Sequence, residues 1–198
     1  MSGNSTSSRP FDGPGLERTT TLTDGVVAIA MTLLVLPLVE VSDEVDLDRP
    51  VSFLADHGDL LISFVVSFLV IYVFWAAHGS AFHRLAQVEP PPALGHLNVW
   101  WLLVVAFLPF PTALVGRHLT TTSAPIYIGT MFVLSALTSA MMMVVDRATA
   151  RGRAGWAWLT TAVFAACALV SLVNADAGML ALLLLVVVRV VEVRVLGR

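Results

Sequence analysis

Long apolar runs alternate with short polar or Pro/Gly-rich breaks along this chain. Each run is close to the length of about 20 residues that an α-helix needs to cross a bilayer. Strands of a membrane barrel would alternate apolar and polar positions, and the run from Leu180 to Val188 does not. We therefore expect an all-α, polytopic membrane protein with six transmembrane helices per chain, at residues 18–39, 59–83, 94–116, 123–146, 155–174 and 178–196.

Two places in this pattern need separate comment. Pro109 and Pro111 lie inside the third run and should kink that helix or end it early, because proline cannot donate a helical hydrogen bond. The break Asn174-Ala175-Asp176 between the last two runs is very short. A single re-entrant hairpin at this point is therefore the alternative to two full spans.

Composition agrees with a membrane protein. Of the 198 residues, 57% are hydrophobic and only 13% are charged, and the mean hydropathy is +0.85. Soluble domains are nearer half apolar and one quarter charged. These values exclude a soluble enzyme domain, a disordered chain and a nucleic-acid binder with a basic face. The single cysteine, Cys167, excludes an intrachain disulfide.

The N-terminal residues differ from the rest of the chain. Residues 1–15 are rich in Ser, Gly and Pro and have no apolar segment of the kind found in a cleavable signal. We expect residues 1–16 to form a disordered tail and residues 17–198 to form one six-helix transmembrane domain.

Charge placement predicts the orientation in the membrane. All eleven basic residues are Arg. With six spans, nine of them lie on the side of both termini, and only Arg49 and Arg117 lie on the other side. Because positive charge accumulates in cytoplasmic loops, both termini are predicted to be cytoplasmic.

The loop at residues 40–59 holds seven of the fourteen acidic residues. One interpretation is that it raises the cation concentration at an external mouth. The other is that it is a solvated loop that its charge keeps out of the membrane. The sequence alone leaves both open.

The first helix carries the most distinctive residues. Asp24 is either an intramembrane carboxylate paired with Arg18, or an acid near the helix start that the helix dipole favours. Ile29, Leu33 and Leu36 share one helix face by their spacing. That face could contact lipid or the bundle core. If copies of the helix met around an axis, it would instead form stacked apolar rings of the kind that gate by dewetting.

Sequence signatures of enzymes are missing. The chain contains no G-x-S-x-G, H-E-x-x-H, Walker loop or Cys/His metal spacing. His78 and His83 are five residues apart, which places them on different faces of a helix and not on the one face a metal site needs. An enzyme is therefore not expected, and neither is a resident metal or cofactor.

The segment from Arg18 to Leu36 reads R-x-x-x-L-T-D-G-V-V-A-I-A-M-T-L-L-V-L. It resembles the first-helix signature of the transmembrane-protein-175 family of potassium channels, R-x-x-x-F-S-D-G-x-x-A-I-A-x-T-L-L-V-L. Two further segments agree with the family, one from Phe74 to Phe82 and one from Leu97 to Leu114. Leu22 and Thr23 replace the usual aromatic residue and serine. The resemblance covers roughly residues 18–116.

This resemblance implies a homotetramer with a central pore lined by the first helix and without a TVGYG filter. Ile29 would form the narrow apolar constriction, Leu33 and Leu36 would extend the apolar path, and Thr32 would supply an oxygen-bearing ring. Potassium would pass near Ile29 and Thr32. The structural polar cluster that locks the first helix against the second and third would comprise Arg18, Thr23, Asp24, His78 and Asn98.

We therefore expect a passive, potassium-permeable channel of a bacterial plasma membrane, with residues 17–198 as the channel domain. It would need no cofactor beyond the permeant ion. Its partners would be other copies of itself, lipid and monovalent cations, with no nucleic acid. The alternative is a proton-coupled secondary transporter that uses Asp24 and His78 as a relay. A non-conducting membrane scaffold is a third possibility, but it leaves the polar cluster without a purpose.

Overall fold

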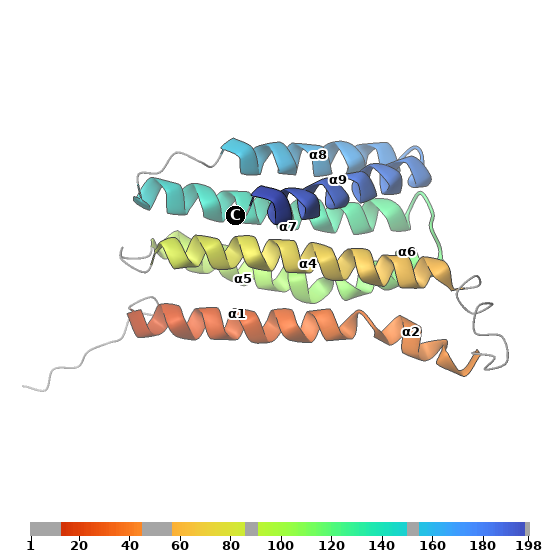
Figure 1. Ribbon diagram of the computed structural model, residues 1–198, viewed down its shortest axis with the longest axis horizontal. Helices are drawn as coiled ribbons and strands as arrows, with labels where there is room; N and C mark the ends of the chain where they lie inside the picture. The colour runs from red at the N-terminus through yellow and green to blue at the C-terminus, as the bar shows by residue number, and fades with distance from the viewer. Residues whose placement is uncertain (1–12, 45–56, 86–90, 150–154, 197–198) are drawn as a thin grey trace, which may run out of the picture.

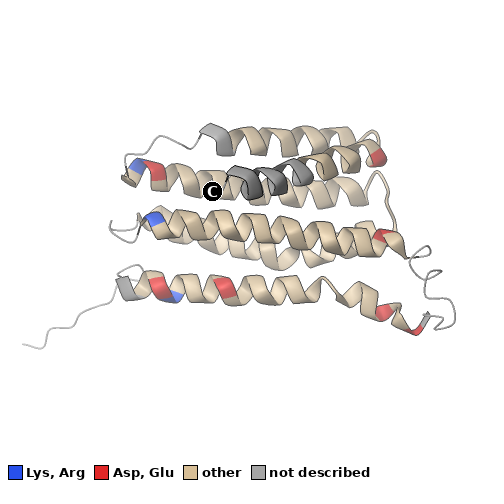
Figure 2. Ribbon diagram, in the orientation of Figure 1, with Lys and Arg blue, Asp and Glu red and all other residues tan. Residues whose placement is uncertain are grey.

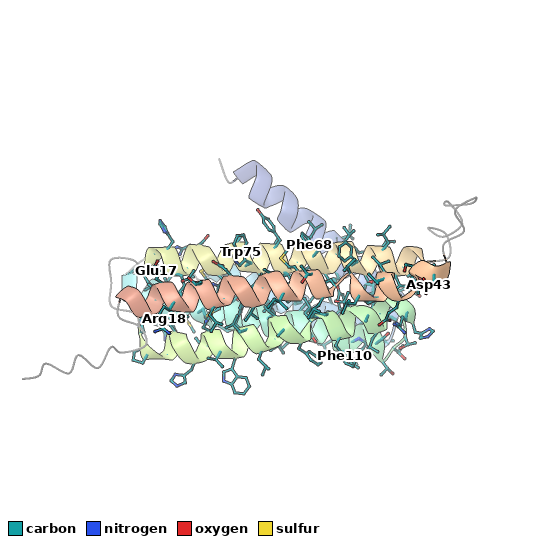
Figure 3. All side chains as sticks on the ribbon, turned by 90° about the horizontal axis from the view of Figure 1, so that it is seen from below. Glu17, Arg18, Asp43, Phe68, Trp75 and Phe110 are labelled. Carbon is teal, nitrogen blue, oxygen red and sulfur yellow. The ribbon has the colours of Figure 1, made fainter. Side chains whose placement is uncertain are left out.

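The computed structural model describes residues 13–44, 57–85, 91–149 and 155–196. Most of its long helices run side by side in three layers (Figure 1), and the last helix is inclined to the others (Figure 3). The first layer, at one edge, is formed by α1 (Gly13–Leu33) and α2 (Leu36–Glu40). The middle layer consists of α4 (Gly58–Arg84), α5 (Pro92–Phe107) and α6 (Pro109–Arg117). The third layer consists of α7 (Ser123–Thr149), α8 (Gly155–Ser171) and α9 (Ala175–Leu196).

The first predicted helix, at residues 18–39, is split in two. Pro37 lies in the first turn of α2 and has no backbone N–H with which to bond the Leu33 carbonyl, so the α-helical ladder is interrupted before it. A tighter bond from the Val35 N–H to the Thr32 carbonyl, 3.3 Å long, closes the turn. After α2 the chain continues into the short 3-10 helix η1 (Ser42–Glu44).

The start of α1 also differs from the sequence prediction. The helix begins at Gly13, so the boundary expected at residue 16 between tail and membrane domain falls within it. Residues 1–12 of the expected tail lie outside the described part of the chain, as do residues 45–56 of the acidic loop.

The third predicted helix is divided into two elements next to its prolines. α5 stops at Phe107 and α6 starts at Pro109. The two nevertheless form one continuous rod, because the Leu108 N–H bonds the Val104 and Val105 carbonyls at 3.1 and 3.2 Å. The proline pair therefore marks the junction of α5 and α6, while Pro92–Arg117 remains one candidate span.

Four segments are long and apolar enough to cross a membrane, namely Gly15–Glu40, Gly58–Arg84, Pro92–Arg117 and Ser123–Thr149. The described apolar parts of the last two helices are shorter, Trp158–Ser171 and Ala175–Leu185. The protein is therefore an all-α, multi-pass membrane protein with at least these four candidate spans.

Buried hydroxyl groups join the helices to one another. The Ser67 hydroxyl of α4 lies 2.9 Å from the Thr112 hydroxyl of α6 and 2.7 Å from the Tyr127 hydroxyl of α7. In a bilayer the surroundings are as apolar as the core, so helix association depends on close packing and on hydrogen bonds of this kind. These bonds hold the middle layer, on which α1 rests, against α7.

Close packing is clearest at Gly116 of α6. A Cβ atom at this position would lie 2.5 Å from the Ser63 hydroxyl oxygen and 2.8 Å from a Leu60 methyl carbon of α4. Only a glycine allows α6 and α4 to approach this closely. The neighbouring Arg117 then reaches Glu40 at the end of α2 and forms an ion pair that connects the first and middle layers.

Candidate pore face and polar cluster

One face of the first layer is open in the single chain. Ile29 is 61% exposed, Leu33 39% and Leu36 49%, so the three residues predicted to share a face all lie on the surface. Val27 and Ala30 point the other way, into the bundle, and are almost fully buried. Because Pro37 breaks the rod, Ile29 and Leu33 belong to α1 whereas Leu36 belongs to α2.

Small residues surround Ile29 on this face. Gly25, Ala28 and Thr32 are all exposed, and nothing lies within 4 Å of a Cβ built on Gly25. Large apolar residues are exposed on both surfaces: Leu22, Ile29 and Leu33 on α1, and Val99, Trp100, Leu103 and Phe107 on α5, where the exposed set includes two aromatic rings. Small residues on a membrane helix allow another helix to approach closely, whereas large apolar ones are suited to lipid.

Thr32 lies one turn after Ile29, with its side chain exposed. Its hydroxyl donates a 2.8 Å hydrogen bond to the Ile29 carbonyl. The hydroxyl proton is therefore directed back at the helix, and the oxygen keeps lone pairs that can accept from water or contact a cation.

Beneath the open face, three buried side chains connect α1, α5 and α4. The Asn98 amide nitrogen donates to the Thr23 hydroxyl oxygen at 3.2 Å. The Asn98 amide oxygen lies 2.6 Å from Nε2 of His78 and accepts a hydrogen bond from it. The Thr23 hydroxyl in turn donates to the Thr19 carbonyl at 2.9 Å. These hydrogen bonds attach α1 to α5 and α4 through buried side chains.

Aromatic rings enclose the His78 imidazole. It stacks on Phe82 with a centroid distance of 4.2 Å and lies 4.6 Å from the Trp101 ring. Trp101 is itself fully buried and donates its indole N–H to the Thr138 hydroxyl of α7 at 3.0 Å. Contacts therefore continue from Thr23 of α1 through Asn98, His78 and Trp101 to Thr138 of α7 in the third layer.

Asp24 belongs to a separate contact. Its side chain is exposed, and Oδ1 accepts a 2.7 Å hydrogen bond from the indole nitrogen of Trp75 on α4. Asp24 and His78, the two members of the alternative proton relay, thus have different partners and share no hydrogen bond in the described structure.

Of the two interpretations of Asp24, the described structure does not show the pairing with Arg18. Both side chains are described and exposed, and no salt bridge joins them. The reason is helical geometry, because residues six apart on an α-helix are rotated by about 120° from one another. In Figure 3 Arg18 and Trp75 lie on opposite sides of α1. Of the five predicted cluster residues, Thr23, His78 and Asn98 come together, Asp24 contacts Trp75, and Arg18 stands apart.

Sequence reasoning did not assign a role to Trp75 or Trp101, yet a signal for both was present. Trp75 precedes His78 by three residues, and Trp101 follows Asn98 by three. Residues three apart are neighbours on one helix face. The two tryptophans could therefore have been placed beside the polar residues.

The described residues contain no group of three or more His, Cys, Asp or Glu side chains that could hold a metal ion. The chemistry of the region is hydrogen bonding and packing. The open face of α1 around Ile29 is apolar apart from the Thr32 hydroxyl. The hydrogen bonds among Thr23, Asn98 and His78 hold the buried side of α1 against α5 and α4.

Residues 18–109 match the family model described as the endosomal/lysosomal potassium channel TMEM175. Among curated proteins, a potassium channel of Streptomyces collinus is 37% identical over 105 residues, which are 52% of this chain and 48% of the relative. A potassium channel of Chamaesiphon minutus is 38% identical over 100 residues, 48% of this chain and 47% of the relative. The matched segment thus spans about half the length of these relatives.

The human endosomal/lysosomal proton channel TMEM175 is 29% identical over 101 residues, which are 50% of this chain and 19% of that protein. Among solved structures, the crystal structure of a lysosomal potassium-selective channel TMEM175 homolog from Chamaesiphon minutus superposes with a TM-score of 0.74. It is 24% identical, and the match covers 90% of this chain and 98% of the other. The two chains therefore share their fold over nearly their full lengths.

Proposed function

Because residues 18–109 match the family model of the endosomal/lysosomal potassium channel TMEM175, we propose that the chain belongs to this family and that it is a passive potassium channel of a bacterial plasma membrane. The family consists of ion channels, and an enzymatic activity is not proposed. The observation that carries the proposal is the open face of α1, which is 61% exposed at Ile29 although it lies in a helix of membrane-spanning length. Gly25, Ala28 and Thr32 lie exposed between its large apolar residues, and small residues of this kind let helices of further copies approach closely.

One chain presents one Ile29, and a single side chain cannot close a pore. A ring of copies around the open face of α1 would place their Ile29 side chains opposite one another, with Leu33 and Leu36 forming further apolar rings. Closed rotational symmetry is the usual arrangement of identical subunits. We propose a homotetramer, the assembly implied by the resemblance to the family.

In such a pore the Ile29 ring would act as the constriction. A narrow apolar ring forces an ion to shed part of its hydration shell, and potassium does so more readily than sodium. The outward oxygen of Thr32, one turn further along, would partly replace the lost water, because its proton is already bonded to the Ile29 carbonyl. Thr23, His78 and Asn98 would hold the helix that carries the ring.

The further assignments concern topology. We propose that α8 and α9 are the fifth and sixth spans and that residues 17–198 form the channel domain after a short cytoplasmic tail. Arg18, Arg84 and Arg147 gather at one end of the bundle, near the start of α1 and the ends of α4 and α7 (Figure 2). This end would face the cytoplasm.

Ion flux through purified protein in liposomes tests the proposal. We expect a steady potassium efflux that needs no pH gradient and does not saturate at moderate potassium concentrations. Uptake that saturates and requires a proton gradient would instead establish the transporter. Protein-free liposomes, and liposomes with heat-denatured protein, give the background leak.

A further inference from the structure

A groove of about 330 Å³ opens between the middle and third layers. It is lined by α4, α7, α8 and α9, whereas α1 packs on the opposite side of the middle layer (Figure 1). The groove is therefore separate from the candidate pore face. Its lining includes Tyr72, Ala77 and Ser80 of α4, Met142 of α7, Phe164 of α8 and Leu185 of α9.

The lining is mostly apolar, and the hydroxyl groups of Ser80, Ser135 and Ser139 are already bonded. Ser135 and Ser139 each lie 2.9 Å from the Thr161 hydroxyl. Ser80 donates to the Ala76 carbonyl at 2.9 Å. A buried water needs two to four polar partners, and these groups offer few. The groove is accordingly suited to an apolar occupant.

The position of the groove in the membrane identifies the source of that occupant. Its walls are parts of α4 and α7, both of which are long and apolar enough to span the bilayer. Tyr72, at 47% exposure, marks the side on which the groove opens to the surface of the bundle. The surrounding solvent at this depth consists of lipid acyl chains.

A cationic side chain follows the groove-lining part of α4, one helical turn beyond Ser80. Arg84 follows Ser80 by four residues and Ala77 by seven, so all three share a face of α4. One guanidinium nitrogen bonds Asp146 of α7 at 3.3 Å, and the side chain remains 29% exposed. A guanidinium has five N–H donors, which leaves several of them for a phosphate oxygen.

From this arrangement we propose that the groove binds one acyl chain of a phospholipid from the surrounding leaflet, with the lipid phosphate at Arg84. The apolar lining accepts the chain, and the arginine at the end of α4 selects a lipid with an anionic head group. The proposal depends on the protein being embedded in a membrane and not on its conducting ions, so the two can fail separately.

The test places a large side chain in the groove by substitution and measures how many lipid molecules remain bound to each chain. Wild-type protein and Ala77→Phe would be purified from vesicles of phosphatidylcholine and phosphatidylglycerol and examined by native mass spectrometry. We expect about one retained phosphatidylglycerol per wild-type chain, and an occupancy about tenfold lower in Ala77→Phe, which corresponds to a loss of about 1.4 kcal/mol. Ala166→Phe is the matched control, because Ala166 is exposed on α8 and does not line the groove.

Smaller changes keep the test decisive if Ala77→Phe does not fold. Ala77→Leu should give an intermediate occupancy. Arg84→Gln should retain phosphatidylcholine while losing most of the preference for phosphatidylglycerol. Equal lipid counts in wild type and both Ala77 variants would overturn the site. An unchanged head-group preference in Arg84→Gln would overturn the position of the phosphate, and a disulfide formed between copies through Ala77→Cys would show that another subunit fills the groove.

Discussion

The Trp75 indole N–H donates a 2.7 Å hydrogen bond to the Asp24 carboxylate and so fastens α1 to α4. Asp24 is exposed at this contact, one turn before the open face that carries Ile29. A hydrogen bond to a charged group contributes about 1.5–3 kcal/mol. Solvent screens this one, so its contribution falls at or below the lower end of that range.

The first prediction concerns this bond. Trp75→Phe removes the donor but keeps an aromatic ring, and Asp24→Asn keeps an acceptor oxygen but removes the charge. We expect each to lower the midpoint of thermal unfolding in detergent, with Trp75→Phe the more harmful, and neither to change the preference for potassium. Arg18→Gln is the control and should leave the midpoint unchanged, because Arg18 forms no salt bridge with Asp24. A larger loss in Arg18→Gln than in Trp75→Phe would contradict this account.

The second prediction concerns the buried connection through Asn98. Thr23→Val removes the acceptor of the Asn98 amide N–H and leaves a buried donor without a partner. Such a group costs about 1–3 kcal/mol, so we expect a clear decrease in the free energy of unfolding. Thr21→Val is the matched control, because the Thr21 hydroxyl is exposed and bonds only the Glu17 carbonyl of its own helix. Equal effects of the two substitutions, measured by denaturant unfolding, would show that the Thr23–Asn98 bond adds little.

The helices could be read from the sequence because each is a long apolar run bounded by polar residues, and the predicted bounds lie within a few residues of those observed. The sequence predicted a structural effect for Pro109 and Pro111 but not for Pro37. Pro109 and Pro111 lie in the middle of a run, where a break is expected. Pro37 lies inside the first predicted helix at residues 18–39, for which no break was predicted, yet α1 ends at Leu33 and α2 begins at Leu36.

The polar cluster was harder to read. Spacing on one helix is given by the sequence, and it places Arg18 and Asp24 on different sides of α1. The partner of Asp24 comes from another helix, and its choice depends on how α1 and α4 are rotated against each other. Packing decides that rotation, through close approaches such as the one at Gly116. The family resemblance identified Thr23, His78 and Asn98, whereas Trp75 required the structure.

The third prediction tests whether the open face of α1 meets other copies. With Cys167 replaced by Ala, an Ile29→Cys variant should form disulfide-linked dimers efficiently under mild oxidation in membranes. Exposed side chains on a shared axis come close to one another, whereas lipid-facing ones do not. Leu169→Cys on α8, which is also exposed, is the control and should remain monomeric on a non-reducing gel. Efficient linkage at position 169 without linkage at 29 would place the subunit contact on the third layer.

The fourth prediction concerns Thr32. Thr32→Ala deletes the outward oxygen but leaves Ile29 and the apolar rings in place. We expect conductance to persist while the preference for potassium over sodium declines, because fewer oxygens replace the lost hydration. Thr32→Ser restores the hydroxyl and should restore the preference. Selectivity that stays the same in Thr32→Ala would remove Thr32 from the permeation path.

The last prediction separates a pore constriction from ordinary contact with lipid. Ile29→Asn places a polar ring at the narrowest point, which keeps water in the neck and lowers the cost of dehydration. We expect a larger conductance and a reversal potential, under bi-ionic potassium and sodium, that moves toward zero. Leu169→Asn makes the same change on exposed α8 and should leave the reversal potential at its wild-type value. If Ile29 faced lipid, Ile29→Asn would behave as Leu169→Asn does: both would conduct less as the helix loses stability, and neither would change selectivity. An unchanged reversal potential in Ile29→Asn channels that still conduct would therefore exclude Ile29 as the constriction.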